Sequence, residues 1–237
     1  MNGHGETRSG EAARLARLLQ FGEQAFPVGG FAFSNGLESA IQTRVVRDAA
    51  TLLAFARTAT EQAATGDGVA LIHAHRAACD ENLDEVARID ALVIARKLSS
   101  EHRHMSTRMG RKAAELSAQV AGEPLIQAWR ERIESGATPG SYPMALAVTF
   151  ASQSLSAREA FLAHHYGVAS TILSSAIRLM RIGHVETQAM LYKLGGDADR
   201  LHDRAAALPL GAMRGFAPMA EVLAAVHVKA HVRLFMN

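Results

Sequence analysis

The sequence predicts an all-α protein, a single-domain bundle of about ten helices. Three observations support this fold class. Apolar residues recur at helical spacing in most segments, and glycine or proline residues separate those segments. No stretch alternates apolar and polar residues as a half-buried strand does, and there is no internal repeat. A chain of 237 residues is long enough for one domain with a substantial core.

Composition narrows the possible function classes. Apolar residues make up 49% of the chain, which excludes a disordered protein. The 25 Lys and Arg residues nearly balance the 23 Asp and Glu residues, so charge gives little support for nucleic-acid binding. Cys79 is the only cysteine, which excludes a disulfide within the chain and a Cys-rich zinc site. Because no apolar run suits a bilayer span or a signal peptide, we expect a soluble cytoplasmic protein.

The N-terminal end is polar and glycine-rich, so we expect a flexible tail at residues 1–10 and a single all-α domain at residues 11–237. The first helix should begin near Glu11 and end before Pro27. Its apolar stripe is formed by Leu15, Leu18 and Leu19.

Four more helices are expected before the middle of the chain. Their starts are predicted at Ser34 or Asn35, at Asp48, at Val69 and near Asn82. The polar residues at these starts are good N-caps, because their side chains accept hydrogen bonds from the first backbone N–H groups of a helix. The glycine-rich triplet at residues 66–68 should break the chain before the fourth helix, and the fifth should run toward Leu98.

The middle of the chain predicts a long helix, a loop and a buried helix. An apolar stripe at helical spacing runs from Ile94 to Leu116. Gly122 and Pro124 end this element, and a short helix is expected over residues 125–133. Four glycine and proline residues mark residues 135–143 as a loop, and the nearly all-apolar residues 144–154 read as a buried helix.

The last third predicts three helices. Ser156 and Glu159 have the spacing of a capping box, which predicts the start of a long helix that reaches Met180. Small residues at 167–176 allow another helix to approach this one closely, in the core or across a dimer seam. Gly183 marks the end or a kink of this helix. Two further helices are expected over residues 186–194 and 219–235.

No catalytic motif is visible in the sequence. The chain has no G-x-x-x-x-G-K-[ST] phosphate loop, no dinucleotide fingerprint after a strand, no H-E-x-x-H and no G-x-S-x-G. A binding or scaffold protein is therefore favoured over an enzyme. Helical enzymes with dispersed catalytic residues stay open as an alternative.

Two groups of residues suggest binding chemistry, and each has a simpler reading. His227 and His231 lie four residues apart on one helix face, a spacing that can chelate a metal, but no third ligand is near in sequence. They equally fit a polar helix flank. The basic residues at 96–112 suggest phosphate or nucleic-acid binding, but no aromatic residues interleave for base stacking. A solvated helix face explains them as well.

Four blocks of the sequence resemble signatures of the UreF family of urease accessory proteins. The first is P-x-G-x-F-x-x-S-x-G-L-E at residues 27–38, and the second is E-x-R-x-x-S-x-x-M-G at residues 101–110. The third covers residues 183–188 after the long helix. The fourth is His227 followed by Arg233-Leu234-Phe235. The blocks come in family order and span nearly the whole chain, so residues 11–237 are identified as a UreF-like domain.

Several positions depart from the family pattern. Phe33 replaces a tyrosine or histidine in the first block, and His184 and Thr187 stand where the family often has glutamine and glycine. His231 replaces a tyrosine, and the tail ends without the usual basic residue and serine. The resemblance therefore points to a divergent member.

The resemblance implies a role in urease maturation. UreF-like proteins are all-α and commonly dimeric, are not known as enzymes, and bridge the accessory protein UreD, also called UreH, and the GTPase UreG. That assembly delivers nickel to apo-urease, so nickel is expected to be handled by the complex, with no cofactor bound stably by this chain. Two alternatives stay open: a helical enzyme or small-molecule-binding protein on the same scaffold, and direct nickel binding through His227 and His231, with His184 as a third ligand.

The same blocks predict the partner-binding residues. They are Phe31, Phe33, Ser34, Gly36, Glu38, Gly183, Gln188, Arg233, Leu234 and Phe235. Glycines and Pro27 can shape a rigid loop that holds both phenylalanine rings at the surface for docking. The alternative is that both rings pack inward. At the other end, we expect a partner such as the UreD-like protein, rather than the chain's own core, to cover Leu234 and Phe235.

Overall fold

The structure is a computed structural model that describes residues 5–23, 25–214 and 234–235. Within these residues the chain forms eleven α-helices and no strand, which confirms the all-α fold class. The helices are α1 Gly5–Gly22, α2 Leu37–Gln42, α3 Ala49–Ala63, α4 Val69–Cys79, α5 Leu83–Arg96, α6 Ser100–Ala121, α7 Pro124–Glu134, α8 Tyr142–Ser152, α9 Ala157–Leu179, α10 His184–Gly195 and α11 Ala198–Ala206. Shorter turns are η1 Gly30–Ala32, η2 Ala64–Gly68 and η3 Leu210–Ala212.

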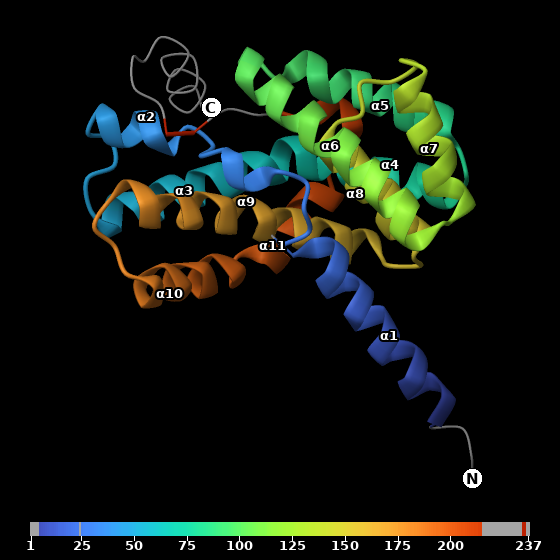
Figure 1. The fold of residues 1–237 in the computed structure, drawn as a ribbon, viewed down its shortest axis with the longest axis horizontal. Helices are drawn as coiled ribbons and strands as arrows, with labels where there is room; N and C mark the ends of the chain where they lie inside the picture. Colours follow the sequence, from blue (N-terminus) through green and yellow to red (C-terminus); the bar gives the residue numbers. More distant parts are fainter. Residues whose placement is uncertain (1–4, 24, 215–233, 236–237) are drawn as a thin grey trace.

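The larger part of the core surrounds α4 and α8. Both helices are apolar on nearly all sides, and eight residues of each are buried. Helices α5, α6 and α7 pack around them on one side of the molecule (Figure 1). Trp129 from α7 and Phe150 from α8 are fully buried there.

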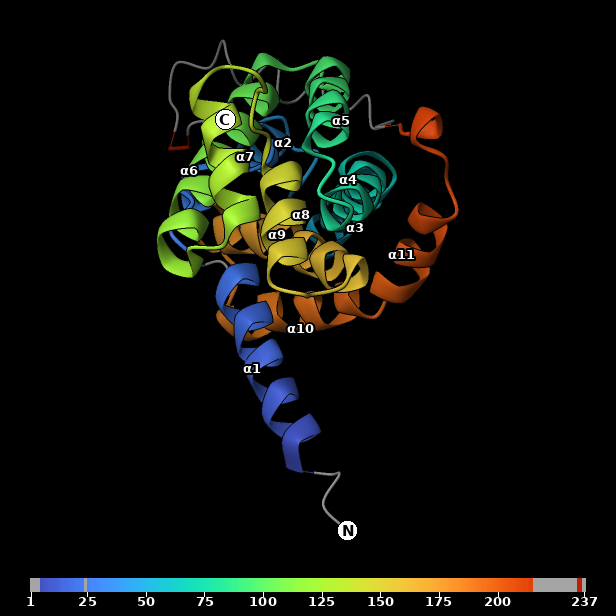
Figure 2. The same cartoon turned by 90° about the vertical axis from the view of Figure 1, so that its right-hand side faces the viewer.

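A second core cluster joins α2, α3, α10 and the C-terminal half of α9. Helix α9 is 23 residues long and reaches both clusters, with Phe161 in the first and Ile172 in the second. Small residues on α9, including Ala169 and Ala176, are buried in the core, so part of its small-residue face packs within the chain. Helix α1 extends away from the body in both views (Figures 1 and 2).

Asp90 fixes the loop between α7 and α8. This residue is 0% exposed, and its carboxylate accepts hydrogen bonds from the Thr138 hydroxyl at 2.6 Å, Gly140 N at 2.6 Å and Ser141 N at 3.0 Å. The loop then passes so close to Gly110 of α6 that an added Cβ would lie 2.2 Å from the Gly140 carbonyl oxygen. The predicted glycine–proline loop is thus a rigid connection that sets where α8 begins.

The predicted helix caps at Asp48, Asn82 and Ser156 are confirmed, but the predicted cap at Ser34 or Asn35 was wrong, because the N-cap of α2 is Gly36 in a left-handed conformation. Asp48 accepts a hydrogen bond from Thr51 N at 2.8 Å, and Asn82 accepts one from Glu85 N at 3.0 Å. Ser156 and Glu159 form the expected capping box at the start of α9.

Two predicted boundaries in the N-terminal third of the chain were wrong. Helix α1 begins at Gly5, six residues before Glu11, since polar residues continue a helix that extends away from the core. Residues 66–68 do not break the chain, because a π-helical turn joins α3 to α4. An added Cβ at Gly68 would lie 2.7 Å from the Phe161 ring, so this glycine serves close packing.

The long stripe from Ile94 to Leu116 is divided between two helices. Helix α5 ends at Arg96, and the Ser99 hydroxyl caps α6 by accepting from Glu101 N at 3.2 Å. The Ser99 N-cap therefore sets the start of a new helix, although the apolar residues keep their helical spacing across this point. Helix α11 was not predicted, because its nine residues hold as many charged side chains as apolar ones, four of each.

The last predicted helix, residues 219–235, lies outside the described residues apart from 234–235, which are not helical. Across the described part of the chain, no helix has the length and hydropathy to cross a bilayer.

Candidate functional site

The segment before α2 is shaped by glycines in the left-handed region. Gly29 has φ +83° and Gly36 has φ +79°, conformations that side chains with a Cβ rarely adopt. Between them, residues 30–32 form one 3-10 turn, and Asn35 also has a positive φ of 53°. Backbone hydrogen bonds from Ala32 N to Gly29 O and from Leu37 N to Ser34 O close two tight turns within this segment.

Helix α9 holds this loop in place. The Ser175 hydroxyl donates a hydrogen bond to the Phe33 carbonyl at 3.2 Å, and the Arg178 guanidinium donates one to the Phe31 carbonyl at 3.0 Å. The loop is therefore attached to the same helix that joins the two core clusters.

Glu38 joins the loop to the C-terminal end. Glu38 lies in the first turn of α2 and is only 4% exposed. Its carboxylate accepts hydrogen bonds from Leu234 N at 2.8 Å and from Phe235 N at 3.1 Å. Figure 1 shows the short red segment 234–235 beside α2. Hydrogen bonds to a charged acceptor are among the stronger ones in proteins, so this carboxylate fixes the segment firmly.

Arg178 lies between two aromatic rings. Its Cζ is 3.9 Å from the centre of the Phe31 ring and 4.1 Å from the centre of the Phe235 ring. Phe235 is 4% exposed, whereas Phe31 is 60% and Leu234 63% exposed. Desolvation lowers the pKa of the Arg178 guanidinium from its ordinary value. We name Phe31, Arg178, Leu234 and Phe235, with Glu38 beneath them, the loop–tail surface.

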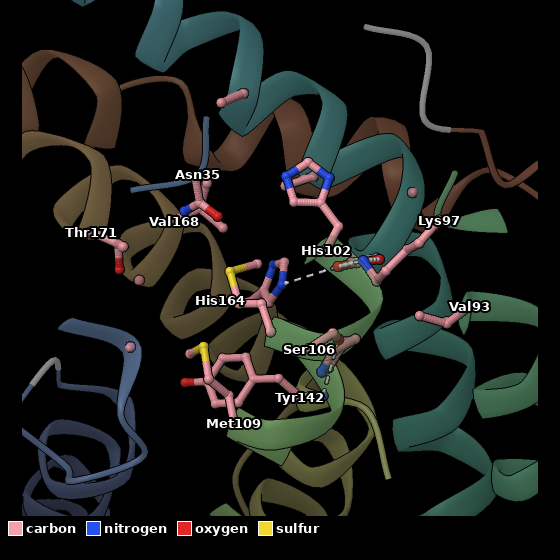
Figure 3. Close-up of a pocket in the computed structure, with 18 of the residues that line it drawn as sticks. Asn35, Val93, Lys97, His102, Ser106, Met109, Tyr142, His164, Val168 and Thr171 are labelled. Carbon is pink, nitrogen blue, oxygen red and sulfur yellow. Dashed lines mark hydrogen bonds and ion pairs between the residues drawn. The ribbon is translucent and has the colours of Figure 1, made fainter. Parts of the chain in front are cut away.

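A cavity of about 190 Å³ lies on the inner side of the same loop (Figure 3). Asn35 lines it from the loop, Tyr142 from α8, and His164 from α9. Met105 and Met109 of α6 form part of its apolar wall.

Charged groups at one end of the cavity neutralise one another. Lys97 Nζ lies 2.9 Å and 2.7 Å from the two carboxylate oxygens of Asp67, which belongs to the π-helical turn. His164 Nε2 is 4.0 Å from the same carboxylate. Burial lowers the pKa of His164 to about 4, against the opposing effect of Asp67, and burial raises the pKa of Tyr142 to about 12. At neutral pH both side chains are therefore uncharged.

The described residues contain no group of three or more His, Cys, Asp or Glu side chains arranged to hold a metal ion. His227 and His231 lie outside those residues. His184 is exposed at the first position of α10.

Comparison with known proteins decides the family. The family model described as UreF matches residues 46–195. Proteins named "Urease accessory protein UreF" from Yersinia enterocolitica serotype O:8 / biotype 1B and Yersinia pseudotuberculosis serotype IB are each 50% identical to this chain over 226 residues. The same holds for the protein of that name from Yersinia pestis strain Pestoides F, and each comparison covers 95% of this chain and 99% of the relative. The chain belongs to the UreF family.

The UreF relatives cover the loop as well as the helical body. The family model begins at residue 46, after the loop, but a continuous match to 95% of the chain must include residues 27–38. The sequence resemblance is thus confirmed at the level of the family, and the chain is one of the urease accessory proteins of the UreF type.

The structure corrects two predictions about this UreF chain. Phe33 is not at the surface but 1% exposed, because its carbonyl bonds to Ser175 and its ring enters the interior beside α9. Phe235 is not left for a partner to cover, because Glu38 binds its backbone N–H and Arg178 lies against its ring. Phe31 does lie at the surface, as the docking interpretation expects.

The other predicted residues of the UreF blocks divide into three groups. Ser34, Gly36 and Glu38 are buried beneath the loop–tail surface. Gly183 and Gln188 are exposed at α10, on the opposite side of α9 from α2 (Figure 1), so the structure does not bring them to this surface. Arg233 lies outside the described residues.

Sequence reasoning missed Arg178, which links the loop and the tail. The only feature of the sequence that singles out Arg178 is its place as a basic residue in the last turn of the long helix.

Proposed function

We propose that this chain is a non-catalytic adaptor in urease maturation. It bridges a UreD/UreH-like protein and a UreG-like GTPase in the cytoplasm, acts as a homodimer, and helps that assembly insert nickel into apo-urease. Nickel is cargo of the complex, and this chain holds no resident cofactor. Membership of the UreF family and relatives named as urease accessory proteins support this role.

The loop–tail surface is the observation that carries the proposal. Three segments that are distant in sequence meet there: the loop at Phe31, the end of α9 at Arg178, and the tail at Leu234. Each is fixed by hydrogen bonds or ring contacts, yet Phe31 and Leu234 expose most of their apolar surface. An apolar pair on a rigid, partly cationic base suits a protein partner, because little conformational entropy is lost on binding.

The first experiment is co-expression of this chain with UreD-like and UreG-like proteins, followed by size exclusion with mass determination. A stable complex heavier than any single component is the expected result. A folded chain that elutes apart from both partners would contradict the adaptor role and favour another function on this scaffold. The same measurement on the chain alone gives its oligomeric state.

The docking surface is tested by Phe31→Ala. The ring is 60% exposed, so its loss should change the free energy of unfolding by less than about 1 kcal/mol. Recovery of the complex should fall at least about tenfold if the ring is an anchor residue in the interface. Val120→Ala is the matched control, since Val120 is 54% exposed on α6. Equal recovery for both variants would place the docking surface elsewhere.

A further inference from the structure

Three polar side chains that line the cavity have no hydrogen-bond partner in the described part of the chain. They are the amide of Asn35, the hydroxyl of Tyr142 and the imidazole of His164. His164 is 5% exposed, and its nearest polar contact, Asp67, lies at 4.0 Å, beyond hydrogen-bond reach. His164 is buried, and Asn35 and Tyr142 are half-buried and face the cavity, so all three side chains are available to hydrogen-bond a ligand inside it.

The surrounding backbone holds these groups in fixed positions. Asn35 has φ +53° and precedes Gly36 at φ +79°, so its amide is carried by a tight reversal of the chain. Tyr142 begins α8 directly after the loop that Asp90 fixes. The π-helical turn that carries Asp67 is a rare element that occurs frequently at functional sites.

The polar groups available to a ligand are uncharged. Asp67 and Lys97 neutralise each other, and the other clearly charged lining residues, Glu23 and Arg96, are of opposite sign. Asn35 is neutral at any pH, and Tyr142 is uncharged at neutral pH. A charged ligand would lose its hydration without gaining a net opposite charge.

The remaining walls favour an apolar body on that ligand. Met105 and Met109 present flexible thioethers, which pack well against aromatic rings, and Val28, Val93 and Val168 add apolar surface. The volume of about 190 Å³ exceeds the ~150 Å³ of an engineered apolar cavity that holds benzene. The space therefore suits one ring with a small substituent.

We propose that this cavity binds a small uncharged molecule with a planar apolar body and an amide-like group. The Tyr142 hydroxyl donates to the carbonyl oxygen of that group, and the Asn35 side-chain oxygen or a His164 nitrogen accepts from its N–H. This inference does not depend on the adaptor role.

Benzamide is the probe, and methionine methyl resonances report where it binds. The full chain is labelled at its methionine methyl groups, and the signals are assigned with Met105→Leu and Met109→Leu. Benzamide should shift the Met105 and Met109 signals saturably, with a dissociation constant on the order of 1 mM, as suits so small a ligand. Met190, buried in the other core cluster, should not shift. Benzoate and benzamidine, of the same shape but charged, should bind at least about tenfold more weakly.

Tyr142→Phe removes only the hydroxyl and should weaken benzamide binding about tenfold. Tyr166→Phe is the control, because Tyr166 is 44% exposed and does not line the cavity. If Tyr142→Phe does not fold, Asn35→Gly replaces it, since glycine accepts the positive φ. The proposal is overturned by the absence of a saturable shift with benzamide, by equal binding of the charged probes, or by unchanged affinity in the folded variant.

Discussion

Two buried carboxylates, in two different parts of this molecule, accept the same kind of hydrogen bonds from backbone N–H groups. Asp90 accepts hydrogen bonds from Thr138, Gly140 and Ser141, and we call this the Asp90 clasp. Glu38 accepts from the backbone N–H groups of Leu234 and Phe235, and we call this the Glu38 clasp. Each carboxylate holds a segment that lies far away in sequence.

The surroundings of the two clasps differ. The Asp90 clasp is enclosed by packed helices, and α6 approaches its loop so closely that only glycine fits at residue 110. The Glu38 clasp lies beneath Leu234, which is 63% exposed, and near Phe31, which is 60% exposed. The same interaction thus supports the fold in one place and an exposed apolar surface in the other. We therefore expect mutations at the first clasp to affect stability, and mutations at the second to affect binding.

The largest effect is expected for Asp90→Ala. The change leaves two backbone N–H groups and one hydroxyl unpaired in the interior, and it should lower the free energy of unfolding by about 4 kcal/mol. Urea denaturation measures this. Asp84→Ala on the same helix is the control, because the Asp84 side chain is 87% exposed and its pair with Arg132 should contribute less than about 1 kcal/mol. Similar losses for both variants would show that the Asp90 clasp does not anchor the fold.

The next effect is a loss of stability in acid that depends on His164. This residue lines the cavity beside α6 and α8, and its pKa is lowered from 6.5 to about 4 by burial. Between these pH values the unfolded chain binds a proton that the folded chain does not, so the free energy of unfolding falls as the pH falls through this window. Full passage through the window should remove roughly 3 kcal/mol.

His164→Gln isolates this contribution from that of the other histidines. The pKa values of His75 and His165 are also lowered, so the wild-type curve contains several protons. Unfolding is measured at several pH values between 7 and 4 in the wild type, in His164→Gln and in His104→Gln, whose histidine is exposed on α6. The slope should flatten in His164→Gln alone. Parallel curves for all three proteins would contradict the expected shift.

A smaller effect is expected at Gly110. An added Cβ would lie 2.2 Å from the Gly140 carbonyl oxygen, so Gly110→Ala must separate α6 from the loop and should cost about 2 kcal/mol. Gly167→Ala is the opposite case, because no atom lies within 4 Å of its added Cβ and the residue is inside α9. It should stabilise the chain by up to about 1 kcal/mol. Thermal denaturation compares the two, and equal shifts would refute the packing difference.

Much of the fold was predictable because local chemistry decides where helices start. The Asp48, Asn82 and Ser156 caps lie where their sequence positions indicate, since each needs only partners within three residues. The prediction that residues 66–68 break the chain was wrong, because Gly68 is there to allow close packing against the ring of Phe161, a residue far away in sequence. Close packing of this kind leaves no local signal.

The candidate site was predictable only in part. The glycine pattern indicated a shaped loop, and Phe31 lies at the surface, as the docking interpretation requires. The outcome for Phe33 depended on Ser175, and the outcome for Phe235 depended on Glu38 and Arg178. These contacts join residues that are more than fifty positions apart, so no periodicity or spacing reveals them.

The smallest effect on stability, but the clearest on binding, is expected for Glu38→Gln. The amide oxygen can keep one of the two hydrogen bonds to residues 234 and 235, so the loss should be about 1 kcal/mol in unfolding experiments. The tail then leaves its fixed place against Arg178, and the loop–tail surface loses its rigid shape. Recovery of the complex with UreD-like and UreG-like partners should therefore fall about tenfold or more, whereas a destabilised Gly110→Ala protein that is still folded should bind as the wild type does. If Gly110→Ala also loses binding, or if Glu38→Gln retains it, the hypothesis that the Asp90 clasp supports stability and the Glu38 clasp supports binding is wrong.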